Sequence, residues 1–314
     1  MRSEKPASQV DLTTHVGSVR LPNPILTASG TSGHGAELQA YFPLSALGAV
    51  VVKSLSAASW AGNPAPRVHE TTGGMLNSVG LQGPGVEAWL ERDLPALEAA
   101  GARVVASIWG TSVEAYGKAA GMLAGAPSCV VAVEVNLSCP NVEARRSVFA
   151  HSVSATSEAI AATASCGLPR WAKLSPNVTD LTEIAAAALG AGAEALTLVN
   201  TVMGMAIDPA TGRPRLGNGG GGLSGPAIHP VAVRAVFECR AAFAEVPIVG
   251  VGGVASGEDA AELLVAGASA VQVGTATFAD PRAPVRVLEQ FEQWCRSHNV
   301  PRVTELIGAS HVRG

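Results

Sequence analysis

Short apolar runs alternate with longer amphipathic or alanine-rich runs from one end of the chain to the other. The short runs are rich in β-branched side chains, which is typical of parallel strands buried on both faces. They predict strands at Pro24–Thr27, Ala49–Lys53, Val104–Ile108, Val130–Val135, Trp171–Leu174, Ala195–Val199, Ile248–Val251 and Ala270–Val273. The runs between them predict helices at Val86–Ala100, Ser112–Ala124, Val153–Cys166, Leu181–Ala191, Pro230–Ala244, Gly257–Ala266 and Pro284–Ser297.

This alternation amounts to about eight β-α units, the number that a closed (β/α)8 TIM barrel of the α/β class requires. An open doubly wound sheet is the alternative fold, because it shows the same alternation. The barrel is favoured because glycine–alanine pairs such as Gly101-Ala102 precede strands, and no GxGxxG motif follows the first strand. The run from Gly217 to Gly222 is typical of a flexible loop. No linker divides the chain, so we expect residues 1–314 to form a single domain.

Charge and cysteine content exclude several classes of function. The net charge is −4 and the basic residues form no stripe, which argues against nucleic acid as a partner. The apolar runs are too short to span a membrane, and Met1 to Gln9 lacks the apolar core of a signal peptide. The five cysteines contain no CxxC pair, so we expect no disulfide framework and no metal site. A soluble cytoplasmic protein is the simplest expectation.

Candidate chemistry stands at the predicted strand ends. In a barrel, the carboxyl ends of the strands form the active face. Reading off those ends gives Ser29, Lys53, Ser107, Asn136 with Cys139, Lys173, Asn200 with Thr201, Gly252 with Gly253, and Gly274 with Thr275. Each is weak evidence alone, but as a set they predict one site around the barrel axis. The long connections from Ser54 to Gly85 and from Thr201 to Ile228 are candidates for its walls.

The glycines after the last two strands indicate a phosphate pocket, because glycine lets the backbone N–H groups approach an anion. Ordinary turn glycines are the alternative. Lys53 and Lys173 stand at the same mouth, and an unpaired buried ammonium is costly, so we expect them to face a ligand that becomes anionic. A cofactor that is anchored by phosphate and gains negative charge on reduction, such as flavin mononucleotide (FMN), fits this pattern. The site asparagines (Asn77, Asn136, Asn141 and Asn200) suit the amide edges of a planar heterocycle.

Cys139 is the candidate reactive group. It follows a buried strand and precedes Pro140, which keeps it on a loop at the strand end. A structural cysteine is the alternative and the commoner role for a lone cysteine, but the flanking Asn136 and Asn141 favour chemistry.

Several motifs together resemble the dihydroorotate dehydrogenase family, most closely the class 1B catalytic-subunit type, from Val10 to Gly308. They are Asn136-Leu137-Ser138-Cys139-Pro140-Asn141, Gly62-Asn63-Pro64-Ala65-Pro66-Arg67, Met75-Leu76-Asn77-Ser78-Val79-Gly80-Leu81-Gln82, Ser224-Gly225-Pro226-Ala227-Ile228 and Gly250-Val251-Gly252-Gly253-Val254. The resemblance implies an FMN-binding barrel that oxidises dihydroorotate to orotate in pyrimidine (UMP) biosynthesis.

The resemblance also assigns roles to residues, with Cys139 as the base. Flavin contacts would come from Ser29, Lys53, Ser54, Ser107, Asn136, Lys173, Val199, Gly225, Gly252, Gly253, Gly274 and Thr275. Substrate contacts would come from Lys53, Asn77, Ser78, Val79, Gly80, Leu81, Asn136, Asn141, Asn200 and Thr201. A homodimer and a partner subunit that carries FAD and an iron–sulfur cluster are usual for this class, so we expect both.

Two departures from the family pattern leave alternatives open. Ser107 replaces a common asparagine, and Ala144-Arg145-Arg146 replaces a glycine-containing stretch in the loop after Cys139. A related dihydropyrimidine-type oxidoreductase and a flavin-binding paralogue without turnover are therefore alternatives. The sequence does not decide between NAD, through a partner, and fumarate as the final electron acceptor.

Overall fold

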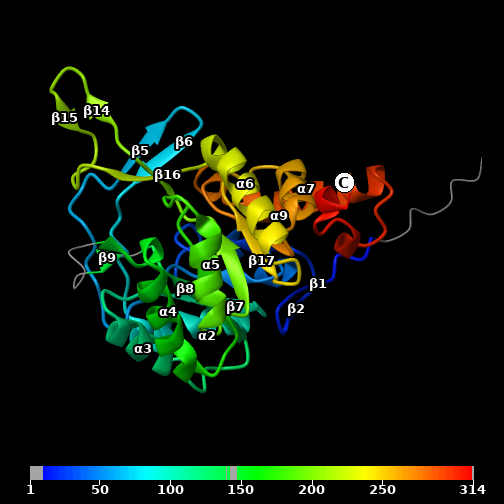
Figure 1. Cartoon of the computed structure of the whole chain (residues 1–314), viewed down its shortest axis with the longest axis horizontal. Coiled ribbons are helices and arrows are strands. Elements are labelled where there is room, and N and C mark those ends of the chain that lie inside the picture. The colour runs from blue at the N-terminus through cyan, green and yellow to red at the C-terminus, as the bar shows by residue number, and fades with distance from the viewer. Residues whose placement is uncertain (1–9, 139, 142–146, 313–314) are drawn as a thin grey trace, which may run out of the picture.

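The computed structural model of the protein describes residues 10–138, 140–141 and 147–312. Eight parallel strands form its centre (Figure 1). Their order is β3-β18-β17-β12-β11-β8-β7-β4, and a parallel bridge between Leu26 and Ala49 joins the first strand to the last. The sheet therefore closes into a barrel. Its strands are β3 (Ile25–Thr27), β4 (Val50–Val51), β7 (Val104–Ile108), β8 (Val130–Asn136), β11 (Arg170–Lys173), β12 (Ala195–Leu198), β17 (Ile248–Val251) and β18 (Ala270–Val273).

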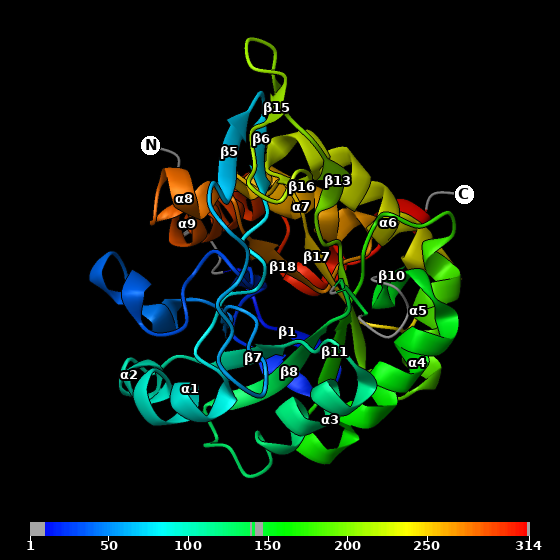
Figure 2. The same ribbon diagram turned by 90° about the vertical axis from the view of Figure 1, so that its left-hand side faces the viewer.

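Helices surround the barrel, as the view in Figure 2 shows. They are α1 (Val86–Arg92), α2 (Leu94–Ala99), α3 (Val113–Gly121), α4 (Val153–Ala162), α5 (Leu181–Gly190), α6 (His229–Ala242), α7 (Gly257–Ala266), α8 (Ala276–Ala279) and α9 (Ala283–Ser297). Short 3-10 helices span Glu37–Ala40, Leu44–Ala46, Phe149–His151, Thr163–Cys166, Pro226–Ile228, Val303–Glu305 and Ala309–His311. None of the helices in the described residues is long and apolar enough to cross a membrane.

The predicted barrel and its strands are confirmed, and most predicted helices are found within a few residues of their expected ends. The helix expected at Val86–Ala100 is instead divided at Asp93 into α1 and α2. Pro95 explains the division, because it lacks the N–H that would continue the hydrogen-bond ladder of α1. The helix expected at Val153–Cys166 ends at Ala162 and tightens into a 3-10 turn.

The two long connections pair with each other above the barrel. The first supplies β5 (Val68–Thr71) and β6 (Gly74–Asn77), and the second supplies β13 (Val202–Gly204) and β16 (Gly221–Ser224). These strands form one antiparallel sheet in the order β13-β16-β6-β5, and β14 (Ile207–Asp208) and β15 (Arg213–Pro214) extend it as a hairpin. Figure 1 shows this sheet and the hairpin on one side of the barrel.

This sheet corrects the expectation that Gly217 to Gly222 is simply a flexible loop. Gly221 and Gly222 belong to β16 and pair with Gly204 and Met203 of β13. A Cβ at Gly222 would stand 2.0 Å from the Thr201 hydroxyl oxygen. Glycine is therefore required here because the Thr201 side chain occupies the space that a Cβ would need, and not for freedom of motion.

The opposite, amino-terminal end of the barrel is closed by a hairpin of β1 (Thr14–Val16) and β2 (Val19–Leu21). Its residues Val16, Val19 and Leu21 are buried in one apolar cluster with interior side chains of the barrel. The barrel contributes Leu26, Ala49, Val51, Val105, Ala132, Trp171, Ala195, Val249 and Ala270 to this cluster. We call the three hairpin residues and these barrel residues together the apolar plug. Burial of apolar surface at this end stabilises the closed barrel.

Candidate functional site

Four polar side chains form a connected layer at the carboxyl ends of the strands. The Asn200 amide donates to Oδ1 of Asn136 over 3.1 Å, and the Asn136 amide donates to Oγ of Ser54 over 3.1 Å. The hydroxyls of Ser54 and Ser107 lie 2.9 Å apart. We call these four residues the polar floor. All four are predicted site residues that follow or lie on separate strands, and the fold brings them together.

Ser107 is one of the two departures from the family pattern. It is fully buried on β7 and bonds to Ser54, whose hydroxyl in turn accepts from Asn136. Ser107 therefore takes part in the polar floor through its hydrogen bond to Ser54. The backbone carbonyl of Asn136 also accepts a hydrogen bond of 2.6 Å from the buried Tyr116 hydroxyl, a support that the sequence did not reveal.

A second hydrogen-bond network holds the side chain of Lys173, a residue that is only 5% exposed. Its Nζ donates to Oγ of Ser29 over 2.9 Å and lies 3.4 Å from Oε1 of Glu134. Oε2 of Glu134 accepts a hydrogen bond of 2.7 Å from Gln272. The ammonium is thus paired with a carboxylate of the protein, although the sequence alone indicated only a ligand opposite it.

Strand geometry sets the level of these groups. Side chains two residues apart on a strand share a face, so Glu134 lies one layer below Asn136 on the inside of β8. Lys173 is the register partner of both Asn136 and Thr197 on the neighbouring strands. Glu134 could have been recognised from the sequence, because it is the one charged residue in an otherwise apolar strand and lies two positions before Asn136.

Lys53 lies at the edge of this layer, half-buried at the end of β4. Burial, and then the positive charge of Arg67, lower the pKa of its ammonium. His34 is its neighbour and was not predicted. Burial, and then the charge of Lys53, lower the pKa of that imidazole, and its buried Nε2 has no hydrogen-bond partner among the described residues. Two bases with lowered pKa values therefore lie at this edge, near enough for the charge of Lys53 to act on His34.

The predicted substrate loop Asn77 to Leu81 is braced by a second predicted motif. Asn63 donates from its side chain to the Ser78 carbonyl over 3.0 Å, and its N–H donates to the Val79 carbonyl over 3.0 Å. Gly80 and Leu81 both have positive φ, at +73° and +60°. A leucine in the left-handed region is strained, and such strain is found mainly where the surrounding structure enforces it at functional sites.

The remaining hydrogen bonds in this region tie the polar floor to the upper sheet. Asn77, on β6, donates from its side chain to the Gly222 carbonyl over 3.3 Å. The N–H of Thr201 donates to Oδ1 of Asn200 over 2.8 Å, and Asn177 donates to the Thr201 carbonyl over 2.9 Å. Asn177 was not predicted, and it fixes the start of the second wall.

The glycine turns after β16 and β17 lie against each other and beside Thr275, which follows β18. Gly225 and Gly253 both have positive φ, at +101° and +74°, and a Cβ on Gly253 would stand 3.0 Å from the Gly225 carbonyl oxygen. A Cβ on Gly225 would stand 3.5 Å from Cγ2 of Thr275, whose hydroxyl donates to Ser224 over 2.8 Å. Turns with positive φ can direct backbone N–H groups toward an anion, so this geometry is compatible with the predicted phosphate pocket.

The remaining predicted site residues have few contacts that define their roles, and two of the predicted segments lie partly outside the described residues. Val199 is buried after β12, Gly252 is buried after β17, and Gly274 follows β18. The backbone of Asn141 pairs with Ser147 in a short ladder between β9 (Pro140–Asn141) and β10 (Ser147–Val148). Cys139 and the altered stretch Ala144 to Arg146 lie outside the described residues.

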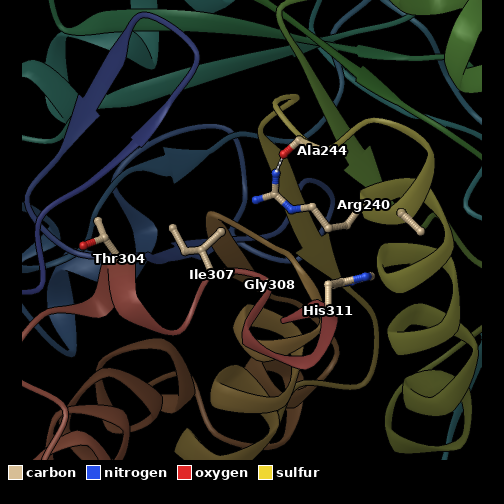
Figure 3. Close-up of a pocket in the computed structure, with 7 residues that line it drawn as sticks. Arg240, Ala244, Thr304, Ile307, Gly308 and His311 are labelled. Atoms are coloured by element: carbon tan, nitrogen blue, oxygen red, sulfur yellow. Dashed lines mark hydrogen bonds between the residues drawn. The ribbon is translucent and has the colours of Figure 1, made fainter. Parts of the chain in front are cut away.

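A separate open pocket lies on the outer surface between α6 and the C-terminal segment (Figure 3). Arg240 reaches into it but donates to the carbonyls of Ala244 and Gly267, and His311 bonds to the Ala266 carbonyl. These polar groups serve the backbone. Because the helices run antiparallel to the strands, the end of α6 lies at the amino-terminal end of the barrel, away from the predicted site.

The described residues contain no group of three or more His, Cys, Asp or Glu side chains that could hold a metal. The four cysteines among them, Cys129, Cys166, Cys239 and Cys295, are free. Burial raises the pKa of the Cys239 thiol to about 12 and that of the Cys295 thiol to about 11, so these two are poor nucleophiles.

Comparison with known proteins agrees with this geometry. A family model described as dihydroorotate dehydrogenase matches residues 11–294. "Dihydroorotate dehydrogenase B (NAD(+)), catalytic subunit" from Geobacter sp. (strain M21) is 46% identical over 300 residues, which cover 95% of this chain and 98% of the relative. The protein of the same name from Desulforudis audaxviator (strain MP104C) is 47% identical over 300 residues, or 95% and 97% of the two chains. The chain belongs to the dihydroorotate dehydrogenase family.

Proposed function

We propose that the protein oxidises dihydroorotate to orotate in pyrimidine biosynthesis, with FMN as the hydride acceptor. The observation that carries the proposal is the polar floor beside Lys173, at the end of the barrel where (β/α)8 enzymes place their chemistry. Membership of the dihydroorotate dehydrogenase family gives the reaction and makes the chain an oxidoreductase.

The residues present fit FMN. Gly225, Gly252 and Gly253 all have positive φ, the backbone geometry of glycine turns whose N–H groups can face a phosphate. Lys173 presents an ammonium at the barrel axis, where it would stabilise the negative charge that the ring gains at N1 and O2 on reduction. Flavin contacts are also expected from Ser29, Lys53, Ser54, Val199, Gly274 and Thr275.

The substrate would lie on the polar floor against the flavin face. The amides of Asn136 and Asn200 supply the donors and acceptors that the ureide edges of dihydroorotate need. Lys53 supplies a positive charge for its carboxylate. Asn77 to Leu81, Thr201 and Asn141 would complete the wall, since the first two segments meet at the upper sheet above the polar floor.

Cys139 would act as the general base. It follows Ser138 in the chain, and the N–H of Ser138 donates to Oδ1 of Asn136 over 3.2 Å, so the segment that leads to the thiol is tied to the polar floor. The thiolate would take a proton from the ring carbon next to the one that loses hydride. When bound, FMN supplies the two-electron acceptor.

For electron disposal we propose a second subunit. The relatives are named as NAD(+)-dependent catalytic subunits, and this name implies a separate partner. We propose a partner that carries FAD and an iron–sulfur cluster, and a homodimer of the present chain at the centre of the assembly. The isolated chain should then reduce NAD slowly, and rapid NAD reduction without a partner would refute this part. Fumarate turnover would indicate the class 1A acceptor instead.

Anaerobic mixing with dihydroorotate tests the proposed function. The purified protein should be yellow, release FMN and not FAD on denaturation, and lose its flavin colour when dihydroorotate is added. Lys173→Met should weaken FMN binding, whereas Lys118→Met, at an exposed position of α3, should not. Bleaching by dihydrouracil but not by dihydroorotate would identify a related dihydropyrimidine oxidoreductase. No bleaching by either substrate would indicate a flavin-binding paralogue.

A further inference from the structure

A fully buried carboxylate lies beneath Lys173 and has no assigned part in the reaction. Glu134 is 0% exposed, and both of its oxygens have partners, Oε1 at 3.4 Å from the ammonium of Lys173 and Oε2 at 2.7 Å from the amide of Gln272. A buried charge is costly unless it is paired and hydrogen-bonded, and this one is both. A buried carboxylate that costs stability in this way is commonly retained for a function.

The geometry shows that Glu134 fixes Lys173 across the barrel. Lys173 rises from β11, bonds to Ser29 at the end of β3 and lies beside Glu134 on β8. β3 and β8 are not neighbours in the sheet, so the ammonium is held between opposite parts of the interior. A long lysine side chain has much conformational freedom to lose, and two fixed partners reduce that freedom.

We propose that Glu134 is a positioning residue that holds Lys173 at the flavin by accepting its hydrogen bond and offsets its charge, with Gln272 orienting the carboxylate. A glutamine at position 134 can still accept that hydrogen bond, so Glu134→Gln keeps Lys173 in place and removes only the charge. The inference rests on the proposed function, because that function places the flavin ring beside Lys173. The negative charge of Glu134 opposes the negative charge that the flavin gains on reduction. Removal of this charge, with Lys173 retained, therefore favours the reduced flavin and raises its midpoint potential.

The test compares three variants with the wild type, each loaded with FMN. Glu134→Gln keeps the shape and removes the charge. Glu134→Asp keeps the charge and withdraws it from Lys173. Thr197→Val is the matched control, because Thr197 is fully buried and is a register partner of Lys173. Within the part of the chain that the structure describes, its hydroxyl has no hydrogen-bond partner to lose.

The measurement is the midpoint potential of bound FMN, together with the Kd of oxidised FMN. In Glu134→Gln, the affinity for reduced FMN relative to that for oxidised FMN should rise by about tenfold. This change raises the midpoint potential by about 30 mV for a two-electron couple. Glu134→Asp should give a smaller rise, and Thr197→Val should match the wild type. The oxidised-FMN Kd separates a changed potential from a simple loss of binding.

The outcomes are distinct. An unchanged or lowered potential in Glu134→Gln would overturn the inference while FMN binding by the wild type leaves the proposed function intact. If Glu134→Gln does not fold, Glu134→Asp decides, and a wild-type potential in that variant has the same negative meaning. Failure of the wild type to bind FMN would refute both the proposed function and this inference.

Discussion

The two ends of the barrel interior are built in opposite ways. The apolar plug fills the amino-terminal end with aliphatic side chains and Trp171, and the hairpin of β1 and β2 closes it. The carboxyl end holds the polar floor, the Lys173–Glu134 pair and the half-buried Lys53. The same eight strands supply both ends. On β7, β8 and β11 the inner face changes from Val105, Ala132 and Trp171 at the plug to Ser107, Glu134 and Lys173.

Unpartnered polar atoms are also divided unevenly between the ends. In the described residues, buried polar atoms without a partner include the hydroxyls of Ser78, Ser138 and Thr197 and Nε2 of His34, all at the carboxyl side. At the plug there is Nε1 of Trp171. Buried polar groups without partners reduce stability, so the plug stabilises the fold while the other end gives up stability for a site that binds.

The largest expected effect is at the carboxyl end and concerns rate. Cys139→Ala should slow flavin reduction by dihydroorotate by roughly 10²–10⁴-fold, the usual share of a general base, with little change in stability or orotate binding. In the wild type, the rate should rise with pH as the thiol ionises, since only the thiolate accepts a proton.

Stopped-flow measurement of flavin bleaching under anaerobic conditions checks the Cys139 prediction. Cys129→Ala is the control, because Cys129 lies before β8, at the other end of that strand. If Cys139→Ala bleaches as fast as the wild type at every pH, the cysteine is structural and the proposed mechanism is wrong.

The fold could be predicted from the sequence because both of its signals are local. Runs of β-branched residues predicted the strands, and glycines before them predicted where the preceding helices end. The resulting number of β-α units, about eight, predicted the barrel. The pairing of the two long connections into one sheet could not be predicted, because the partners Asn77 and Gly222 are far apart in sequence. For the same reason, a glycine-rich run looked like a loop although close packing explains it.

The site was predictable where a residue stands at a strand end. Ser107, Asn136 and Asn200 were found in this way, and the structure joins them through Ser54, which only the family resemblance had assigned to the site. Glu134 and His34 were missed, because their significance lies in which neighbour the fold gives them. Strand alternation places Glu134 on the same face as Asn136, but the partner on β11 is set by the sheet order.

The next effect concerns stability at the same end. Lys173→Met leaves Glu134 as a buried charge without its cation, and should lower the free energy of unfolding of the apoprotein by about 3–5 kcal/mol. The double variant with Glu134→Gln should lose less than the sum of the two single changes. Urea unfolding of all four proteins measures this coupling.

Arg234→Met provides the contrast for that cycle. Arg234 pairs with Glu238 over 2.8 Å on the surface of α6, where both side chains are exposed. An exposed pair contributes about 0–1 kcal/mol, so this variant should barely change the unfolding midpoint. Additive effects of Lys173→Met and Glu134→Gln would show that the buried pair is not coupled.

A change in the plug should affect stability alone. Leu21 is fully buried between the hairpin and the barrel, and Leu21→Ala should cost about 2–5 kcal/mol. The flavin of the folded fraction should still be reduced at the wild-type rate. Arg20→Ala, at the exposed position next to it on β2, should stay within about 0.5 kcal/mol of the wild type. A slowed flavin reduction in Leu21→Ala would show that the two ends are not independent.

The smallest effect has the opposite sign and belongs to Lys53. Its pKa in the folded protein is lowered from 10.5 by burial and by Arg67. Between that lowered pKa and 10.5, the unfolded chain binds more protons than the folded one, so stability of the apoprotein should rise with pH across this window. At neutral pH, below the window, the cost of holding the charged ammonium is fully present.

Lys53→Met should therefore stabilise the apoprotein at neutral pH, by about 0.5–2 kcal/mol, while it weakens orotate binding. The pH-dependent rise in stability within the window should disappear with the ammonium. The pKa of His34 should move upward in the variant, because Lys53 lowers it, while burial and the charges of Asp93 and Glu37 remain. Urea unfolding across the pH range and NMR titration of His34 measure the two effects separately. Loss of stability in Lys53→Met at neutral pH would mean that Lys53 supports the fold, and the division of labour between the two ends would fail at this residue.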